Sequence, residues 1–524
     1  MQQPAINIAS RQSRRSALKV LAAGAAALPV LSCNRSAMAQ AVGAQATPAW
    51  ADIPHTPTTL KEQIARAGVE RFRPERFGAK GDGVTNDTDA FAAMGRAIEM
   101  AGGGIVELAS QATYIVGKQR FLGGIGAQGD VVGQVLSYLP SRILWLRNLP
   151  KGLAILGNRA RLRAAHGLRY GTFDPLTGEA NRHPMPYLGY DIAYPYAAMI
   201  GLHDVTGPVV IENLELDGSS DHYMWGGERG DTGWQIPCNG LLIEQCPTVV
   251  LDNVESHHHG LDGLQCEAGG TFSVLNSRFH HNCRLNGNLR AGSGFAAVNC
   301  SFDFAAKGAH FSAPAGGFDL EAELATEPIV RPRFINCRFR HNRYQGMAAD
   351  SGDTSQAWFE NCVFWSGTPQ ESNPIYVSKP GFKFRYCTFG GPLIILGGDP
   401  NVAGRLPFFE KCLFTDDPKS GSLNGTVNLE TGNINVSSGG IMFHQCTFQL
   451  RNSCIPNVAD PGVVFDECLL VTSPNIYLVI SGTYRNCRLI GRQIDLNNSS
   501  QVRFEGHTSV NGHLLPSSHM PPET

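Results

Sequence analysis

Residues 317 to 323 read GFDLEAE and place a carboxylate at every second position, Asp319, Glu321 and Glu323. In an extended strand successive side chains point to opposite faces, so the three acids share one face and the apolar residues between them share the other. Like charges in a row destabilise a fold by mutual repulsion. Such a row is therefore expected where a cation neutralises it or where a reaction needs the carboxylates. The chemistry of this stretch therefore depends on the strands that lie beside it.

Eleven six-residue segments share one pattern, in which an apolar or aromatic residue stands first and Asn most often stands third. The segments are IENLEL, LDNVES, VLNSRF, AVNCSF, FINCRF, FENCVF, FRYCTF, FEKCLF, FHQCTF, FDECLL and YRNCRL. Their third residues fall at 213, 253, 276, 299, 336, 361, 386, 411, 445, 467 and 486, so the pattern recurs about every 19 to 25 residues, with three longer intervals. Such a period predicts one structural coil per repeat, with loops inserted into three coils.

A cysteine stands fourth in eight of these segments. Equivalent residues of stacked coils lie about 4.8 Å apart, and a free cysteine behaves as a small buried hydrophobe. We expect an inward ladder of free thiols rather than disulfide bonds, because backbone pairing already joins the coils. The eight residues are Cys300, Cys337, Cys362, Cys387, Cys412, Cys446, Cys468 and Cys487.

The Asn at the third position predicts a sharp turn. In FENCVF, Phe359 and Cys362 cannot both point inward from one straight strand, because their positions differ in parity. A bend at Asn361 resolves this, since Asn tolerates the left-handed backbone that such a turn needs. Asn recurs here at Asn213, Asn253, Asn276, Asn299, Asn336 and Asn486. Short strands, one turn type and stacked side chains predict an all-β fold, a right-handed parallel β-helix of about 12 coils.

Residues 77–116 read FGAKGDGVTNDTDAFAAMGRAIEMAGGGIVELASQATYIV. This segment resembles the opening of the pectate-lyase-like superfamily of right-handed parallel β-helix, carbohydrate-active proteins. The resemblance implies that a short helix caps the open end of the solenoid and that GGGIVEL begins the first coil. Asn86 or Asp87 can cap the helix. Residues near helical spacing support it independently, namely Phe91, Met94, Ile98 and Met100.

The resemblance also implies that the first strand after the long corner loop of each coil carries the ligand groove. Parity within these strands defines the outward residues. One column contains Glu244, Glu267, Arg290, Glu321 and Asp350, and beside it runs a second column of Gln265, Asn288 and Asp319. Charges on a solvated sheet can simply pair along the ladder. Five acids and two amides around one arginine favour a functional site.

Two reactions fit these columns, and the resemblance favours the first, β-elimination of a uronic-acid polysaccharide by a lyase. The expected calcium ligands, which would neutralise the sugar carboxylate, are Glu267, Asp319 and Glu321. Arg290, or Lys307 or His310 nearby, would take the C5 proton.

The second reaction is that of a glycoside hydrolase or glycan transferase with two catalytic carboxylates. Glu267 and Glu321 lie two coils apart, roughly 9.6 Å between backbones, near the separation of an inverting pair. Glu244 and Glu267, one coil apart, would suit retention. The residues alone leave the two reactions open.

Two inserted segments carry aromatic residues beside charges. Residues 218–237 contain DHYMWGGERGDTGW, and residues 185–196 contain PYLGYDIAYPY. Aromatic faces stack on sugar rings while neighbouring polar groups bind hydroxyls. We expect Tyr223, Trp225 and Trp234 to form part of a groove wall, although loop aromatics also pack onto the coils beneath.

Histidines follow the turn asparagines by four to six residues, in SHHHG, FHHNC and RHNR. They are expected to stack at another corner of the coils, with a zinc site as the alternative.

The first 39 residues resemble a twin-arginine export signal. SRRSALK contains Arg14 and Arg15, and the weakly apolar LAAGAAALPVL that follows is too short to span a bilayer. Ala37 and Ala39 fit a soluble cleavage site, whereas VLSC, ending at Cys33, resembles a lipobox that would leave a lipid anchor. The signal implies a periplasmic or secreted protein. The predicted layout is a signal peptide at 1–39, a linker at 40–70, the β-helix domain at 71–510 and a tail at 511–524.

The 43 Lys and Arg residues nearly balance 45 Asp and Glu residues, so no basic surface for nucleic acid is predicted. No transmembrane span is expected either. The expected partner is a polysaccharide or oligosaccharide, bound by a monomer or a small homo-oligomer. The sequence thus predicts an exported polysaccharide lyase, with a glycoside hydrolase or transferase and a noncatalytic glycan-binding β-helix as alternatives.

Overall fold

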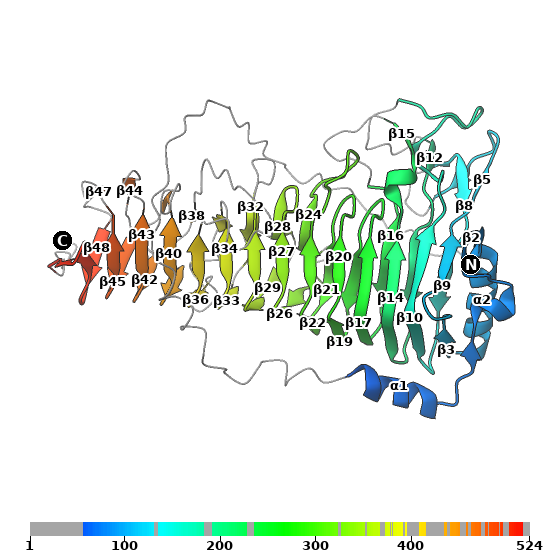
Figure 1. The fold of residues 1–524 in the computed structure, drawn as a ribbon, viewed down its shortest axis with the longest axis horizontal. Helices are drawn as coiled ribbons and strands as arrows, with labels where there is room; N and C mark the ends of the chain where they lie inside the picture. The colour runs from blue at the N-terminus through cyan, green and yellow to red at the C-terminus, as the bar shows by residue number, and fades with distance from the viewer. Residues whose placement is uncertain are drawn as a thin grey trace. The chain divides into compact units, whose positions relative to one another are not determined.

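A computed structural model describes the protein over residues 56–516, apart from 130–134, 183–190, 228–234, 323–325, 352–353, 367–372, 378, 380, 391–392, 396–407, 416–433, 437–440, 451–456, 459–462, 473–476, 480–481, 492 and 496–501. All described residues belong to one compact unit, Ala49–Thr524. Its strands pair in parallel from coil to coil, which confirms the predicted right-handed parallel β-helix (Figure 1). Among the described residues no helix is long and apolar enough to cross a membrane.

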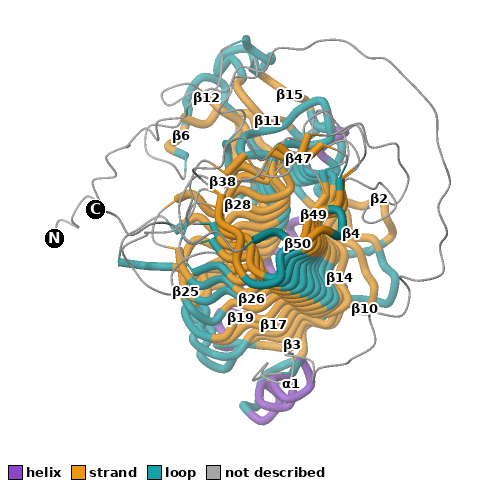
Figure 2. The backbone as a smooth tube through the Cα atoms, turned by 90° about the vertical axis from the view of Figure 1, so that its left-hand side faces the viewer, coloured by secondary structure: helices purple, strands orange, loops and turns teal. Residues whose placement is uncertain are grey.

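Two large parallel sheets run along the coils, and Figure 2 shows them nearly end on. The first is a 28-stranded sheet that bends within each coil. The second is a 13-stranded sheet, which follows the corner loops and carries the expected site residues. Its main path consists of β9 (Leu144–Arg147), β13 (Ala198–His203), β16 (Asn239–Glu244), β18 (Leu264–Ala268), β21 (Gly287–Gly292), β24 (Gly316–Glu321), β28 (Gln345–Ser351), β32 (Asn373–Val377), β35 (Leu393–Ile395), β38 (Ile434–Val436) and β41 (Asn457–Val458).

The bend of the 28-stranded sheet lies at the predicted turn residue. All seven predicted asparagines have a left-handed backbone, with φ between 50° and 56°. Their side chains form a ladder along the surface, in which Asn299 Nδ2 donates to Asn276 Oδ1 at 3.1 Å and Asn336 Nδ2 donates to Asn299 Oδ1 at 3.1 Å. Four later coils keep the same backbone with another residue, namely Tyr386, Lys411, Gln445 and Glu467.

The Asn turn makes a testable contribution to stability. Asn299 has a φ of 56°, a backbone conformation that Ala tolerates less well than Asn. Asn299→Ala also removes two ladder contacts, so we expect it to lower the free energy of unfolding by about 2 kcal/mol. Asn299→Gly removes the same contacts without the steric cost and should lose less. Urea unfolding of both variants measures the difference, and equal losses would contradict a steric role for this backbone.

Stacked rings and thiols fill the interior of the coils. The rings of Phe334, Phe359 and Phe384 lie parallel, with centroids 4.9 Å and 4.8 Å apart. The eight predicted ladder cysteines are buried and free, as are the other four cysteines among the described residues. Cys362 Sγ, for example, donates to the carbonyl of Phe334 at 3.3 Å. The predicted thiol ladder is confirmed.

The predicted capping helix is α2 (Thr88–Ala101), and Asn86 Oδ1 accepts a hydrogen bond from the backbone N–H of Thr88 at 3.2 Å. Asp87 instead accepts from the backbone N–H groups of Lys80 and Gly81. Three of the four predicted apolar residues are buried, Phe91, Met94 and Ile98. Met100 also lies in this helix but is 85% exposed, because its position falls off the apolar stripe that the other three define.

A second helix, α1 (Pro57–Arg66), lies within the segment that the sequence placed in the linker. Thr56 caps it by accepting from the backbone N–H of Thr59 at 3.2 Å. Leu60 and Ile64 are buried in a small apolar cluster with residues of the first coils, Ile105, Ala154, Val210 and Val250. Burial of these two side chains ties α1 to the solenoid.

Inserted segments build a small five-stranded sheet beside the first coils (Figure 1). Its strands are β15 (Met224–Gly226), β11 (Arg169–Thr172), β12 (Asp191–Ala193), β7 (Val135–Leu136) and β6 (Ala127–Gln128). Trp225 therefore lies in a strand.

Candidate functional site

The outer face of the 13-stranded sheet carries the residues that the sequence selected. Gln265 of β18 pairs with Asn288 of β21, and Asn288 pairs with Asp319 of β24. The register of the second predicted column is confirmed, but Asn288 and Asp319 are buried, at 2% and 3% exposed, where the sequence predicted outward residues. Within β24, Phe318 and Leu320 are buried like Asp319, and Glu323 lies outside the described residues.

The first predicted column is wrong in register at two places. A bulge in β21 sets Glu267 opposite Ala291 instead of Arg290. A second bulge in β28 sets Glu321 opposite Ser351 instead of Asp350, whose side chain lies outside the described residues. Each bulge adds one residue to one strand, so strict alternation cannot predict the register beyond it.

The bulge at Arg290 aims its side chain back toward β16. Arg290 Nη1 lies 2.9 Å from Glu244 Oε1, and His203 Nδ1 lies 2.9 Å from Glu244 Oε2. The His203 ring stacks on Trp145 at a centroid distance of 4.8 Å. His203 and Trp145 were not predicted from the sequence. The same strand parity places them on this face one and two coils further back, since His203 pairs with Glu244 and Trp145 pairs with Gly201.

These contacts give Glu244 and Glu267 opposite electrostatic environments. Burial would raise the pKa of Glu244, but the hydrogen bonds and charges of His203 and Arg290 outweigh it and hold that pKa below its usual value. Burial raises the pKa of Glu267, and the charge of Glu244 raises it further, while Arg290 offsets only part of this effect. Within the described part of the chain no ion pair involves Glu267.

A buried network holds the next carboxylate, Glu321. Arg284 Nη1 lies 2.9 Å from Asp262 Oδ2, and Arg284 Nη2 lies 3.3 Å from Glu321 Oε2. Asn288 Nδ2 donates to the same Glu321 Oε2 at 3.1 Å. Asp262 is fully buried and accepts the backbone N–H of Leu285 at 3.1 Å. Arg284 thus bridges a buried carboxylate and one on the surface.

Burial raises the pKa of Asp262 to about 6, against the attraction of Arg284. Burial would lower the pKa of Arg284, but the charges of Asp262 and Glu321 raise it above its usual value. Asp262 and Arg284 were not predicted from the sequence because both lie in turns, where strand parity gives no direction for a side chain.

One of the three expected calcium ligands, Glu321, already has two donors on one oxygen. Arg284 and Asn288 both donate to Oε2 of Glu321, and the guanidinium adds positive charge where a cation would bind. Glu267, Asp319 and Glu321 are not among the groups of described residues whose ligand atoms all lie within 4.8 Å of one another. Calcium binding by these three residues stays a prediction.

The aromatic wall predicted from the inserts differs from what the structure shows. Tyr223 is only 7% exposed, and its hydroxyl lies 3.2 Å from that of Tyr196 in the core; its place on a wall is wrong because its ring completes the interior. Trp225 is partly buried and stacks on His310, with centroids 4.3 Å apart. Lys307, just before His310, is exposed, and Trp234 lies outside the described residues.

The predicted histidine stack is confirmed at the corner that follows the 28-stranded sheet. The rings of His258 and His281 lie 5.1 Å apart, and His281 continues the column through Phe304 to His341.

No protein-family model matches the sequence, and no curated protein matches it. Solved structures do resemble the chain. The A-module of the mannuronan C-5 epimerase AlgE4 of Azotobacter vinelandii is 14% identical, with 85% of this chain and 100% of that chain covered and a TM-score of 0.36.

The catalytic unit of a GH87 α-1,3-glucanase from Streptomyces thermodiastaticus is 12% identical, covers 84% of this chain and 69% of that chain, and has a TM-score of 0.40. PfbA, a surface adhesin of Streptococcus pneumoniae, is 11% identical, with 84% and 90% covered and a TM-score of 0.41. At these scores none of their activities transfers to this chain, and the fold assignment rests on the strand pairing.

Proposed function

We propose that the protein is an exported enzyme that cleaves a polysaccharide by hydrolysis, with Glu267 as general acid and Glu321 as general base. The observation that carries this proposal is the contrast between two carboxylates on one rigid sheet face. Glu267 has no ion-pair partner among the described residues, whereas Arg284 and Asn288 hold Glu321. Pairs of carboxylates in contrasting environments are what acid–base catalysis requires.

Glu267 suits the acid because its environment favours the protonated form. The side chain is half-buried, and both burial and the charge of Glu244 raise its pKa. A carboxylic acid that keeps its proton closer to neutral pH can protonate the oxygen of a leaving sugar.

Glu321 suits the base because two donors fix it while it remains accessible. Arg284 and Asn288 orient the carboxylate, and 30% of the side chain is exposed, so water can reach it. Glu267 lies on β18 and Glu321 on β24, with β21 between them. Two strand spacings give roughly 9.6 Å between backbones, close to the separation of an inverting pair. We therefore expect the first product to have the inverted anomeric configuration, which NMR of the fresh product measures.

The pH dependence of hydrolysis tests the role of Glu244. Activity should fall as pH rises through the raised pKa of Glu267, because the acid loses its proton. Glu244→Gln removes a charge that raises this pKa, while the charge of Arg290, which lowers it, stays. The basic limb of the pH–rate profile should therefore move to lower pH in this variant. An unmoved limb, or a shift to higher pH, would contradict the assignment of Glu267 as the acid.

A uronate lyase is the second candidate, because Arg290 stands at a bulge in the middle of the acidic face. Its guanidinium is engaged by Glu244, which supports a structural role more directly than a role as base. A noncatalytic glycan-binding protein would bind sugars on the same face without cleaving them.

Export is the part of the proposal that rests on residues 1–39, which resemble a twin-arginine signal. Two forms of the protein would follow, a soluble one after cleavage behind Ala39 or a lipid-anchored one at Cys33. Mass spectrometry of the protein isolated from the cell envelope distinguishes them.

A further inference from the structure

Three histidines at the corner after the 28-stranded sheet direct one ring nitrogen each toward a carboxylate. His257 Nε2 lies 3.1 Å from Glu215, and His280 Nε2 lies 2.8 Å from Glu255. His258 Nε2 lies 3.7 Å from Asp221. The carboxylates come from β14 (Val209–Asp217), β17 (Thr248–His257) and the 3-10 turn Ser220–His222. An ionised carboxylate only accepts hydrogen bonds, so it favours the tautomer with the proton on Nε2.

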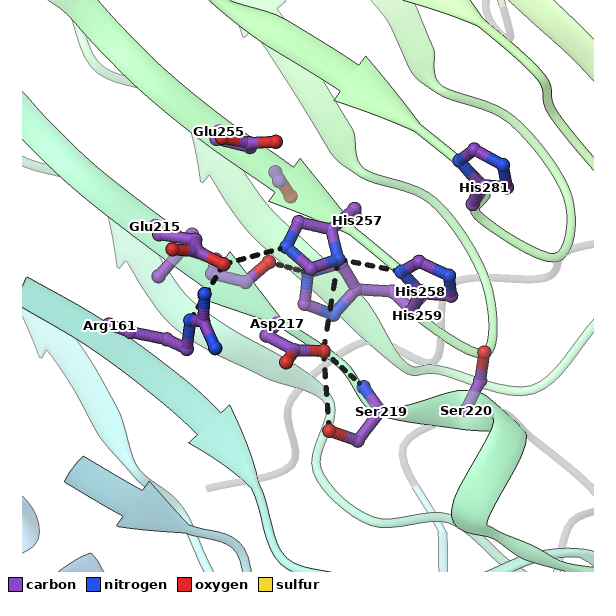
Figure 3. Close-up of polar contacts among 12 residues, drawn as sticks. Arg161, Glu215, Asp217, Ser219, Ser220, Glu255, His257, His258, His259 and His281 are labelled. Atoms are coloured by element: carbon purple, nitrogen blue, oxygen red, sulfur yellow. Dashed lines mark hydrogen bonds and ion pairs between the residues drawn. The ribbon is translucent and has the colours of Figure 1, made fainter. Parts of the chain in front are cut away.

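The Nδ1 atoms of His257 and His280 each lie close to the Nδ1 atom of the next histidine in the chain, His258 and His281. His257 Nδ1 lies only 2.6 Å from His258 Nδ1, and Figure 3 shows this contact together with Glu215 on the far side of the His257 ring. The three histidines offer ligand atoms that all lie within 4.8 Å of one another. His281 repeats the arrangement one coil further, with its Nδ1 2.9 Å from His280 Nδ1.

Two imidazole nitrogens that face each other need something between them. If both carry their proton on Nε2, both Nδ1 atoms present lone pairs, which repel at 2.6 Å. A proton on His258 Nδ1 relieves the repulsion, but it leaves a lone pair on His258 Nε2 facing Asp221. A proton on His257 Nδ1 relieves it too, with Asp217 Oδ1 3.8 Å away, but it makes that ring a cation. A metal ion between the two Nδ1 atoms relieves the repulsion and leaves both Nε2–H groups directed at their carboxylates.

We propose that His257, His258 and His280 form a binding site for a divalent transition-metal ion of the zinc type, with Nδ1 as ligand atom in each. Histidines that ligate metals usually donate their other N–H to a carboxylate, and each of these three has such a carboxylate. Imidazole nitrogen suits Zn²⁺, Cu²⁺ and Ni²⁺ and does not suit Ca²⁺ or Mg²⁺. The side chains are 11%, 30% and 15% exposed in that order, so the ion can enter from solvent and hold water or a ligand in a fourth position.

A purely structural histidine stack is the competing explanation. The rings of His257 and His280 lie parallel, 4.8 Å apart, and such stacking needs no metal. Metal binding requires one ring to tilt, because both in-plane lone pairs must then point at one ion about 2.0 to 2.1 Å away. The two explanations therefore differ in their metal affinity, which can be measured without an assay of enzymatic activity.

The experiment is isothermal titration of ZnCl₂ into the protein, freed of any affinity tag and treated with chelator, near neutral pH. His258→Asn removes one ligand and keeps a residue that tolerates the φ of 57° at this position. His341→Asn is the matched control, since it lies in the same ring column with φ 56° but outside the three ligands. Thermal unfolding without metal checks that both variants fold like the wild-type protein.

We expect the wild-type protein and His341→Asn to bind one Zn²⁺ with equal affinity and His258→Asn to lose that binding. Glu215→Gln, which removes the negative charge beside His257 Nε2 and leaves the three histidines in place, should weaken binding about 10- to 100-fold. Absence of Zn²⁺ binding to the wild-type protein would overturn the site, as would binding that survives in His258→Asn, which would place the ion elsewhere. Polysaccharide cleavage does not enter this test, so its outcome is independent of the proposed hydrolysis.

Discussion

Glu267→Gln is expected to lower kcat for polysaccharide cleavage by a factor of about 100 to 10,000, the range that a positioned general acid contributes. Gln has nearly the shape of Glu but cannot release a proton to the leaving oxygen. Because burial and Glu244 already favour the neutral form of Glu267, the substitution should leave the fold and the binding of substrate almost unchanged. KM should therefore stay close to that of the wild-type enzyme while kcat falls.

The control for this variant is Glu360→Gln, which neutralises a half-buried glutamate of β30 (Trp358–Glu360) in the 28-stranded sheet. It changes the net charge equally and should keep full activity. Glu321→Gln should reduce kcat like Glu267→Gln, since water loses its base. If kcat of Glu267→Gln or Glu321→Gln stayed close to that of the wild-type enzyme, the catalytic role assigned to that glutamate would be contradicted. A rise in KM alone would indicate that the residue only binds the substrate.

Arg284→Met is expected to lower the free energy of unfolding by about 3 to 5 kcal/mol, the usual result of removing one partner from a buried ion pair. The substitution leaves the fully buried Asp262 without its cation. It also removes one of the two donors that hold Glu321, so activity should fall even under conditions where the variant remains folded. Urea unfolding followed by circular dichroism measures the loss of stability.

The double variant Asp262→Asn/Arg284→Met separates two effects of losing Arg284: the cost of leaving the charge of Asp262 unpaired, and the effect on Glu321. Asn can still accept the backbone N–H of Leu285 without carrying a charge, so most of the lost stability should return. Activity should stay low, because Glu321 remains without Arg284. Equal stability of the single variant and the wild-type protein would show that Asp262 is not held as a buried charge.

The sequence predicted the solenoid because each coil repeats the same local requirements. Asn361 needs a left-handed backbone whichever coil precedes it, and Cys362 needs an inward position next to Phe359. These requirements are local, so parity and turn chemistry suffice. The same reasoning placed Gln265 and Asn288 side by side correctly.

The candidate site was less predictable because it departs from the repeat. The bulge at Arg290 adds one residue to its strand and turns the side chain toward Glu244. No residue type in this part of the sequence predicts the bulge. Arg284 lies in a turn, where direction depends on tertiary contacts. Tyr223 resembles a loop residue in sequence, yet it contacts Tyr196 in the core, since only the folded insert shows which aromatic faces inward.

The measurement that tests the central claim most directly is a cleavage assay on a panel of uronate polysaccharides and neutral glucans, which records new reducing ends together with ultraviolet absorbance. Hydrolysis by the Glu267 and Glu321 pair predicts reducing ends without absorbance, and loss of both activity and product in Glu267→Gln. Absorbance that rises with the reducing ends reports the unsaturated sugar made by elimination. That result, abolished in Arg290→Ala, would contradict the carboxylate pair and establish the lyase instead.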